Sequence, residues 1–193
     1  MTASDLSWTL NQYRAAEIRG ANVILRLGRL ADTTRLRSNF SRHLRDEGVH
    51  AWMWTRLLDD LGVEILDVDD AYQMRLGTLF GLPRSLDQLL ALTLVSERRG
   101  VATYTEHLAS APPEPVARAL RGILKDERWH VDWIGEELER RAEADPSVRE
   151  VLARAEAADR QAMEDLRHEA ARLGAARSTA VGKIAVPGSG AAP

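Results

Sequence analysis

The chain contains 193 residues, with 26 basic and 29 acidic side chains, five histidines and no cysteine. This length fits one domain with a substantial core. The nearly balanced charge argues against a nucleic-acid partner, and the lack of cysteine excludes disulfides, a thiolate nucleophile and cysteine-bound metals or iron–sulfur clusters. No apolar stretch reaches about 18 residues, and the N-terminus shows no signal-peptide pattern, so we expect a cytoplasmic protein without a membrane partner.

Apolar residues recur at three- and four-residue intervals, which predicts an all-α protein without strands. The predicted helices cover about residues 5–31, 33–61, 85–110, 114–143 and 146–173. Gly62 closes the second helix, and Ser85 with Gln88 forms a capping box for the third. Asp145 and Pro146 mark the start of the last one. A short helix over Ala71–Leu79 is expected within the connection between the second and third helices.

These helices predict one domain over residues 1–174, followed by a flexible tail over 175–193 that is rich in Gly, Ala and Ser. Short turns make the first two helices antiparallel, and likewise the third and fourth. The connection over 62–84 is long enough to run back along the molecule, which would make the second and third helices parallel. Such a crossover marks one class of four-helix bundle, to which a C-terminal fifth helix is added here.

The two halves of this arrangement repeat one another. At a shift of 80 residues, Glu17 aligns with Glu97, and Asp46-Glu47-Gly-Val-His50 aligns with Asp126-Glu127-Arg-Trp-His130. Apolar residues share the helix face of each Glu and each His, so this face is expected in the core. Buried carboxylates without partners cost several kcal/mol each, and something must therefore neutralise them.

The helical hairpins are expected to bring the repeated Glu and His residues to the same level along the bundle axis. Glu17 and Glu47 are centred on Asp32, and Glu97 and Glu127 on Pro112, both in predicted turns. Four carboxylates and two imidazoles then meet at the middle of the bundle, which is a ligand set for two divalent metals. We favour this interpretation over two salt-bridged helix pairs with satisfied core histidines. Each preceding aspartate lies four residues before its own histidine, and we expect it to accept that imidazole's other N–H.

This pattern resembles the ferritin-like di-iron carboxylate superfamily over about residues 5–143. The resemblance implies a ferritin-like four-helix bundle and two iron ions, or manganese or a mixed pair, with O₂ as co-substrate. The implied metal ligands are Glu17, Glu47, His50, Glu97, Glu127 and His130, with Asp46 and Asp126 behind them. A carboxylate of Glu47 or Glu127 would bridge the two metals.

Further residues share the predicted metal face. His43, four residues before Glu47, is similar to the extra histidine ligand of arylamine N-oxygenases of this superfamily, although an ordinary histidine beside the site is the favoured alternative. Tyr104 is a candidate hydrogen-bond donor or redox residue behind the ligands, against a plain buried tyrosine. Gly20 and Gly100, together with Trp52, are candidates for lining a substrate pocket; close helix packing would equally explain the glycines.

The resemblance predicts an oxidoreductase: an O₂-activating oxidase or oxygenase that hydroxylates, N-oxygenates or desaturates a small organic substrate. Its electrons would come from a separate reductase or ferredoxin, and a homodimer is also considered. The alternatives are a ferroxidase or iron-storage subunit, a rubrerythrin-like peroxide scavenger, a manganese catalase, and a bundle that has lost its metal. The sequence does not identify a substrate.

Overall fold

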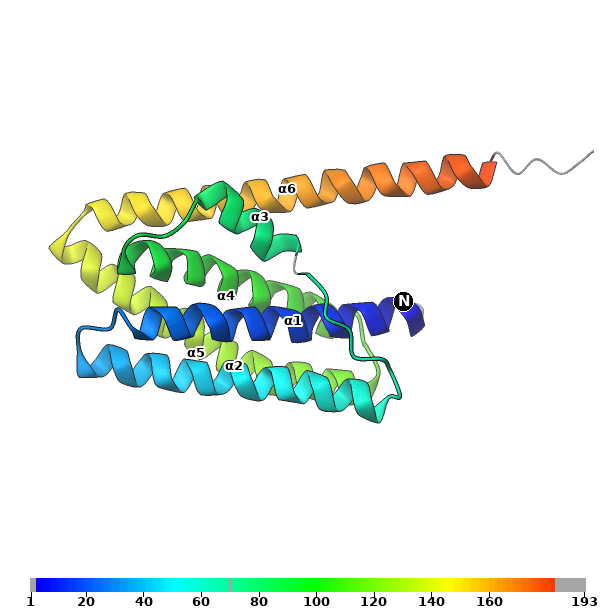
Figure 1. Ribbon diagram of the computed structural model, residues 1–193, viewed down its shortest axis with the longest axis horizontal. Coiled ribbons are helices and arrows are strands. Elements are labelled where there is room, and N and C mark those ends of the chain that lie inside the picture. Colours follow the sequence, from blue (N-terminus) through cyan, green and yellow to red (C-terminus); the bar gives the residue numbers. More distant parts are fainter. Residues whose placement is uncertain (1–2, 70, 183–193) are drawn as a thin grey trace, which may run out of the picture.

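The computed structural model describes residues 3–69 and 71–182, and its described part is all-helical, as the sequence predicts. The helices are α1 (Ala3–Gly28), α2 (Thr34–Asp60), α3 (Ala71–Phe80), α4 (Leu86–Ala109), α5 (Glu114–Ala144) and α6 (Ser147–Gly182). Figure 1 shows α1, α2, α4 and α5 side by side, with α3 and α6 along one flank. Among the described residues, no helix is both long enough and apolar enough to cross a membrane.

The chain direction follows from the connections. Tight turns reverse the chain between α1 and α2 and between α4 and α5, while residues 61–85 travel back along the molecule (Figure 1). As a result α2 and α4 run parallel, as the length of the connection suggests. The crossover contains α3, which matches the short helix expected over Ala71–Leu79.

Side-chain caps fix where the helices begin. Thr33 accepts a hydrogen bond from the N–H of Leu36, and Ser85 accepts one from the N–H of Gln88. The Gln88 side chain does reach back, but it accepts from the N–H of Arg84 rather than from that of Ser85. These caps satisfy backbone donors that lack a partner within the helix.

Two apolar clusters occupy opposite ends of the core. The cluster beside the α1–α2 turn contains Ile24, Leu36, Phe40, Leu94, Trp133, Ile134 and Leu138. The cluster at the other end contains Leu10, Tyr13, Trp54, Leu58, Tyr104, Leu120 and Ile123. In α1, α2, α4 and α5, the repeated Glu and His residues lie in the sequence between residues of the two clusters. They therefore form a polar layer with apolar side chains on both sides.

Helix α6 covers α3 and α4 through a third cluster of small and aromatic residues, namely Leu76, Phe80, Ala91, Val95, Ala155, Ala158 and Ala162. The helix continues to Gly182, so the part of the expected tail at 175–182 is helical, contrary to the prediction. Three of these eight residues are alanine, the residue with the highest helix propensity, although the serine, threonine, valine and glycine there favour a helix less. Residues 183–193 of that predicted tail lie outside the described residues.

A single buried asparagine holds the crossover against α1. Asn11 has no exposed surface; its Nδ2 donates to the carbonyl of Glu64 at 3.0 Å, and its Oδ1 accepts from the N–H of Leu66 at 2.8 Å. These bonds satisfy backbone groups of a segment without regular structure. The two bonds therefore fix the position of the crossover relative to α1, ahead of α3.

We expect Asn11→Ala to lower the free energy of unfolding by about 1–3 kcal/mol, because the two hydrogen bonds to the backbone of Glu64 and Leu66 are lost together. Urea unfolding of the metal-free protein measures this loss. Asn22→Ala is the matched control: Asn22 is exposed and bonds only within its own helix, so a change within about 0.5 kcal/mol is expected. Equal losses in the two variants would contradict this role of Asn11.

Candidate metal centre

Seven metal-ligand side chains converge in the polar layer between the two apolar clusters. They are Glu17 from α1, His43, Glu47 and His50 from α2, Glu97 from α4, and Glu127 and His130 from α5. All seven are buried, with at most 7% of each residue exposed. The structure thus brings together the six ligands expected from the repeat and the additional histidine at position 43.

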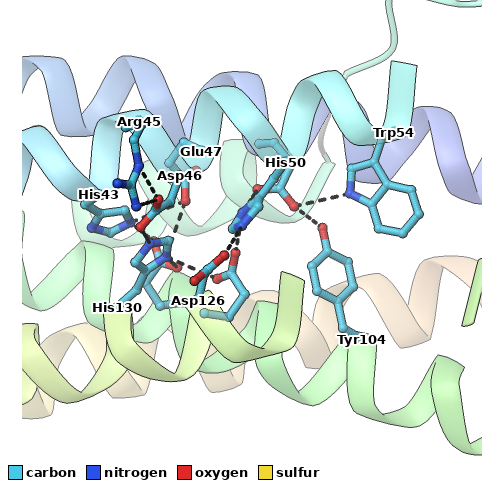
Figure 2. A network of polar contacts seen from close by, with 12 residues as sticks. His43, Arg45, Asp46, Glu47, His50, Trp54, Tyr104, Asp126 and His130 are labelled. Carbon is cyan, nitrogen blue, oxygen red and sulfur yellow. Dashed lines mark hydrogen bonds and ion pairs between the residues drawn. The ribbon is translucent and has the colours of Figure 1, made fainter. Parts of the chain in front are cut away.

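These residues form two overlapping groups that could each hold a metal ion. One contains His43, Glu47, Glu97 and His130; the other contains Glu17, Glu47, His50 and Glu127. Within each group, one ligand atom per residue lies within 4.8 Å of the others. Glu47 is the member shared by both, and Figure 2 shows it between the histidines of the two sides. A carboxylate in that position is placed to bridge two ions.

The two groups differ in their nitrogen donors. In the first group, His43 Nε2 lies 3.3 Å from both Glu47 Oε1 and Glu97 Oε1, and His130 Nδ1 lies 3.5 Å from the same Glu47 oxygen. In the second, His50 Nδ1 lies 3.0 Å from Glu127 Oε1 and 3.4 Å from Glu17 Oε2. The first group therefore offers two imidazoles and the second offers one.

The histidines fit a metal better than they fit a hydrogen-bond network. In the described structure, both ring nitrogens of His43, His50 and His130 are buried and lack a well-oriented hydrogen bond, despite the carboxylates nearby. Buried polar atoms are rarely left without a partner unless they serve an ion or a reaction. Four carboxylates would also balance the charge of two divalent ions, so the residues present suit such a pair.

Two aspartates face the Nε2 atoms of the histidines, in a pairing that the sequence prediction had wrong. His50 Nε2 lies 3.5 Å from Asp126 Oδ2, and His130 Nε2 lies 3.6 Å from Asp46 Oδ2. Each aspartate thus faces the histidine of the other hairpin, not the one four residues later in its own helix. The Nδ1 atoms are left to face the carboxylate ligands, as they must to reach a metal.

Tyr104 and Trp54 both contact Glu17 from the apolar cluster at one end of the site. The Tyr104 hydroxyl and the Trp54 indole N–H donate to the same oxygen, Glu17 Oε1, the latter at 3.4 Å (Figure 2). Tyr104 is therefore a hydrogen-bond donor behind a ligand. Trp54 is not among the site residues expected from the sequence, although it lies four residues after His50 and so shares its helix face.

A cavity of about 120 Å³ adjoins the centre between α1 and α4. Gly20 and Gly100 line it, as do all four glutamates, whereas none of the three histidines does. Trp52 does not line it, which corrects the sequence prediction: its side chain is 60% exposed and lies near Arg56 on the surface. A residue two positions after His50 lies on nearly the opposite face of the helix, which explains why Trp52 points away from the cavity.

The two repeat-related glycines are not equivalent. A Cβ on Gly20 would overlap Glu47 Oε2, whereas a Cβ on Gly100 would sit 4.0 Å from Glu127 Oε2, an ordinary contact. Glu47 therefore occupies space that only a glycine at position 20 leaves free.

Crowded carboxylates shift the pKa values of the site when no metal is bound. Burial, followed by repulsion from Glu97, raises the pKa of Glu47 well above its usual range and that of Glu127 to about 7. Burial alone would lower the pKa of His50 and His130, but neighbouring carboxylates outweigh it and raise these values to about 11 and 9. For His43 burial dominates and lowers the pKa, so this imidazole is neutral at pH 7.

We expect Gly20→Ala to weaken Mn(II) binding about tenfold or more, because the new methyl group displaces the shared Glu47 carboxylate. Gly100→Ala is the matched control and should change affinity no more than about twofold, since both substitutions raise helix propensity by about 1 kcal/mol. Titration followed by the electron paramagnetic resonance signal of free Mn(II) measures both. Equal affinities would show that Glu47 does not need this position.

We also expect metal binding to release protons and to strengthen as the pH rises from 6 to 9. At pH 7 the raised pKa values keep His50 and His130 protonated, and a protonated ligand must lose its proton to bind. Below about pH 7 Glu127 holds a proton as well, so the dependence should be steeper there. Calorimetry in buffers of different ionisation enthalpy counts the protons. His168→Ala, on the exposed face of α6, should leave the count unchanged; affinity independent of pH would contradict the prediction.

Comparison of the chain with protein-family models, with curated proteins and with solved structures gives no match. The assignment of a candidate metal centre therefore rests on the burial, spacing and chemistry of its own residues.

Proposed function

We propose that the chain is a ferritin-like four-helix bundle that binds two iron ions and activates O₂ to oxidise a small organic substrate. The observation that carries this proposal is the pair of buried ligand groups joined by Glu47. A carboxylate-rich set with few imidazoles suits iron or manganese better than copper. When bound in the reduced state, the two ions would supply electrons to O₂.

The position of the cavity supports an oxygenase or oxidase. It contacts Glu17, Glu47, Glu97 and Glu127 on one side of the centre, while the histidines lie on the other side. Small molecules can therefore approach the centre from the carboxylate side. Gly100 leaves space on this side, Gly20 leaves room for the Glu47 carboxylate, and the apolar clusters cover the centre above and below.

We further propose that His43 is a seventh metal ligand. It has no exposed surface, it lies 3.3 Å from carboxylates of two different helices, and its ring stacks on that of His130 with centroids 3.6 Å apart. Its lowered pKa leaves the imidazole neutral, as a ligand must be. The group with two imidazoles would then differ from its neighbour in charge and in affinity.

The chain's own residues have definite tasks in this proposal. Tyr104 and Trp54 hold Glu17 from behind, so this carboxylate keeps its orientation. Asp46 and Asp126 face Nε2 of His130 and His50, so each would accept the imidazole N–H that points away from a bound metal. Electrons would come from a reductase or ferredoxin. A ferroxidase is the alternative, which would use the same ligands but no organic substrate.

Anaerobic loading with Fe(II), followed by exposure to O₂, tests the proposal. We expect two iron ions per chain and a transient visible absorption band. An oxidisable substrate should shorten the lifetime of this band. Glu47→Ala should reduce binding below one ion per chain, because both groups lose their shared carboxylate; Glu136→Ala, an exposed glutamate on α5, is the matched control. Stoichiometry unchanged in Glu47→Ala would overturn the metal assignment, and a hollow oligomer that accumulates iron would favour storage.

The variant His43→Ala tests whether His43 is a seventh metal ligand or only a neighbour of the site. As a ligand, His43 should be needed for one of the two ions, so the variant should bind the second iron at least about tenfold more weakly. Unchanged affinities and an unchanged Mössbauer spectrum of the loaded variant would remove His43 from the ligand set.

A further inference from the structure

A second cavity lies directly outside the one at the metal centre. Its volume is about 250 Å³, and it shares five wall residues with the inner cavity: Ala16, Gln73, Ser96, Gly100 and Tyr104. Exposed Thr103 and half-buried Gln12 line its outer part. The two cavities are therefore neighbouring chambers, one beside the four glutamates and the other beside exposed Thr103.

The outer chamber depends on the two helices that flank the four long ones. Helix α3 contributes Tyr72, and α6 contributes Met163 and Leu166. A polar network fastens these helices to α4: Asp159 accepts from Tyr72 at 2.8 Å and from both Arg99 Nε and Nη2, at 3.1 and 2.7 Å. Figure 1 shows α3 and α6 together along this flank. They supply a roof that α1 and α4 alone would lack.

The chambers offer little net charge to a ligand. Arg99 is the only charged residue lining the outer chamber, and its two bonds to Asp159 neutralise it. In the inner chamber, the four glutamates would be balanced by two divalent ions. An ionic ligand would lose its hydration without gaining a counter-charge, which is unfavourable. The wall thus favours a neutral molecule.

The size and polarity of the two cavities further restrict the class of ligand that could bind there. A dry cavity of about 150 Å³ is large enough for benzene, so an inner chamber of about 120 Å³ suits a molecule of about that size. Among the residues that line both cavities, Ser96 and Gln73 are polar, while Ala16 and the ring of Tyr104 offer apolar surface. Gly100 leaves this shared wall without a side chain on α4.

We propose that the two chambers form one passage that binds a neutral, ring-sized organic molecule carrying a hydrogen-bonding group, and that α3 and α6 roof this passage. The proposal rests on the proposed function, because it names the class of substrate that would reach that centre. It gives α6 a role that its sequence alone does not suggest.

Three probes of similar shape and different charge test this passage: benzyl alcohol, benzoate and benzylammonium. Saturation-transfer nuclear magnetic resonance on the full chain, loaded with diamagnetic Zn(II) so that the four glutamates are balanced, measures binding of each. Benzyl alcohol should bind with a Kd of about 1 mM, as expected for a ligand of its size, and the two ions at least about tenfold more weakly. Equal binding of the three, or no binding of benzyl alcohol, would overturn the proposal.

Two variants locate the binding. Gly100→Val places a side chain in the wall shared by the two cavities, and Leu166→Asp places a charge in the roof; each should weaken benzyl alcohol binding at least about fivefold. Gly135→Val on α5 and Ala170→Asp on α6 are the matched controls, because neither residue lines the passage. Circular dichroism and thermal unfolding verify the fold of each. Binding that Gly100→Val and Leu166→Asp leave unchanged would place the probe elsewhere.

Loading with Mn(II) separates this proposal from the proposed function. Bound Mn(II) should accelerate relaxation of the ring protons of benzyl alcohol in the wild-type chain. Mn(II) binding without probe binding would reject the passage and keep the metal centre. Probe binding to the metal-free chain, with no Mn(II) bound on loading, would reject the metal centre instead.

Discussion

Four carboxylates buried in one layer of a helical core set the main constraint on this molecule. Mutual repulsion and lost hydration oppose their burial, as the raised pKa values of Glu47 and Glu127 show. Without a metal, the raised pKa values of His50 and His130 keep these imidazoles positively charged beside the carboxylates, which partly offsets the repulsion. Apolar clusters cover the layer on two sides, so water can hydrate these carboxylates only from the adjoining cavity, and cations or protons could balance their charge.

The helical spacing of apolar residues and the internal repeat were the two patterns on which most of the sequence prediction rested. They predicted an all-helical protein, and they selected the six Glu and His residues that the structure brings together. Spacing along one helix could also have separated Trp54 from Trp52, since four residues return to the same face and two do not. The inclusion of Trp52 in the pocket overlooked that rule.

What the sequence could not provide depends on how the two hairpins are set against each other. His43 acquires its place from Glu97 on another hairpin, at 3.3 Å, and no spacing within α2 reports that contact. The same holds for the aspartates, whose partners are fixed by the relative rotation of α2 and α5. The roof of the cavities is a third case, because it requires α3 and α6 to fold back onto α4.

The crossed aspartates also bear on how such a chain could arise. Each hairpin contains a carboxylate pair and a histidine, but the group that orients this histidine belongs to the other hairpin. A single hairpin would be incomplete alone, yet two identical copies facing each other about a twofold axis would complete one another. The tandem repeat in this chain has the form of such a symmetric pair joined by a linker. Once joined, the halves could diverge, and His43, whose counterpart is Ile123, is a mark of that divergence.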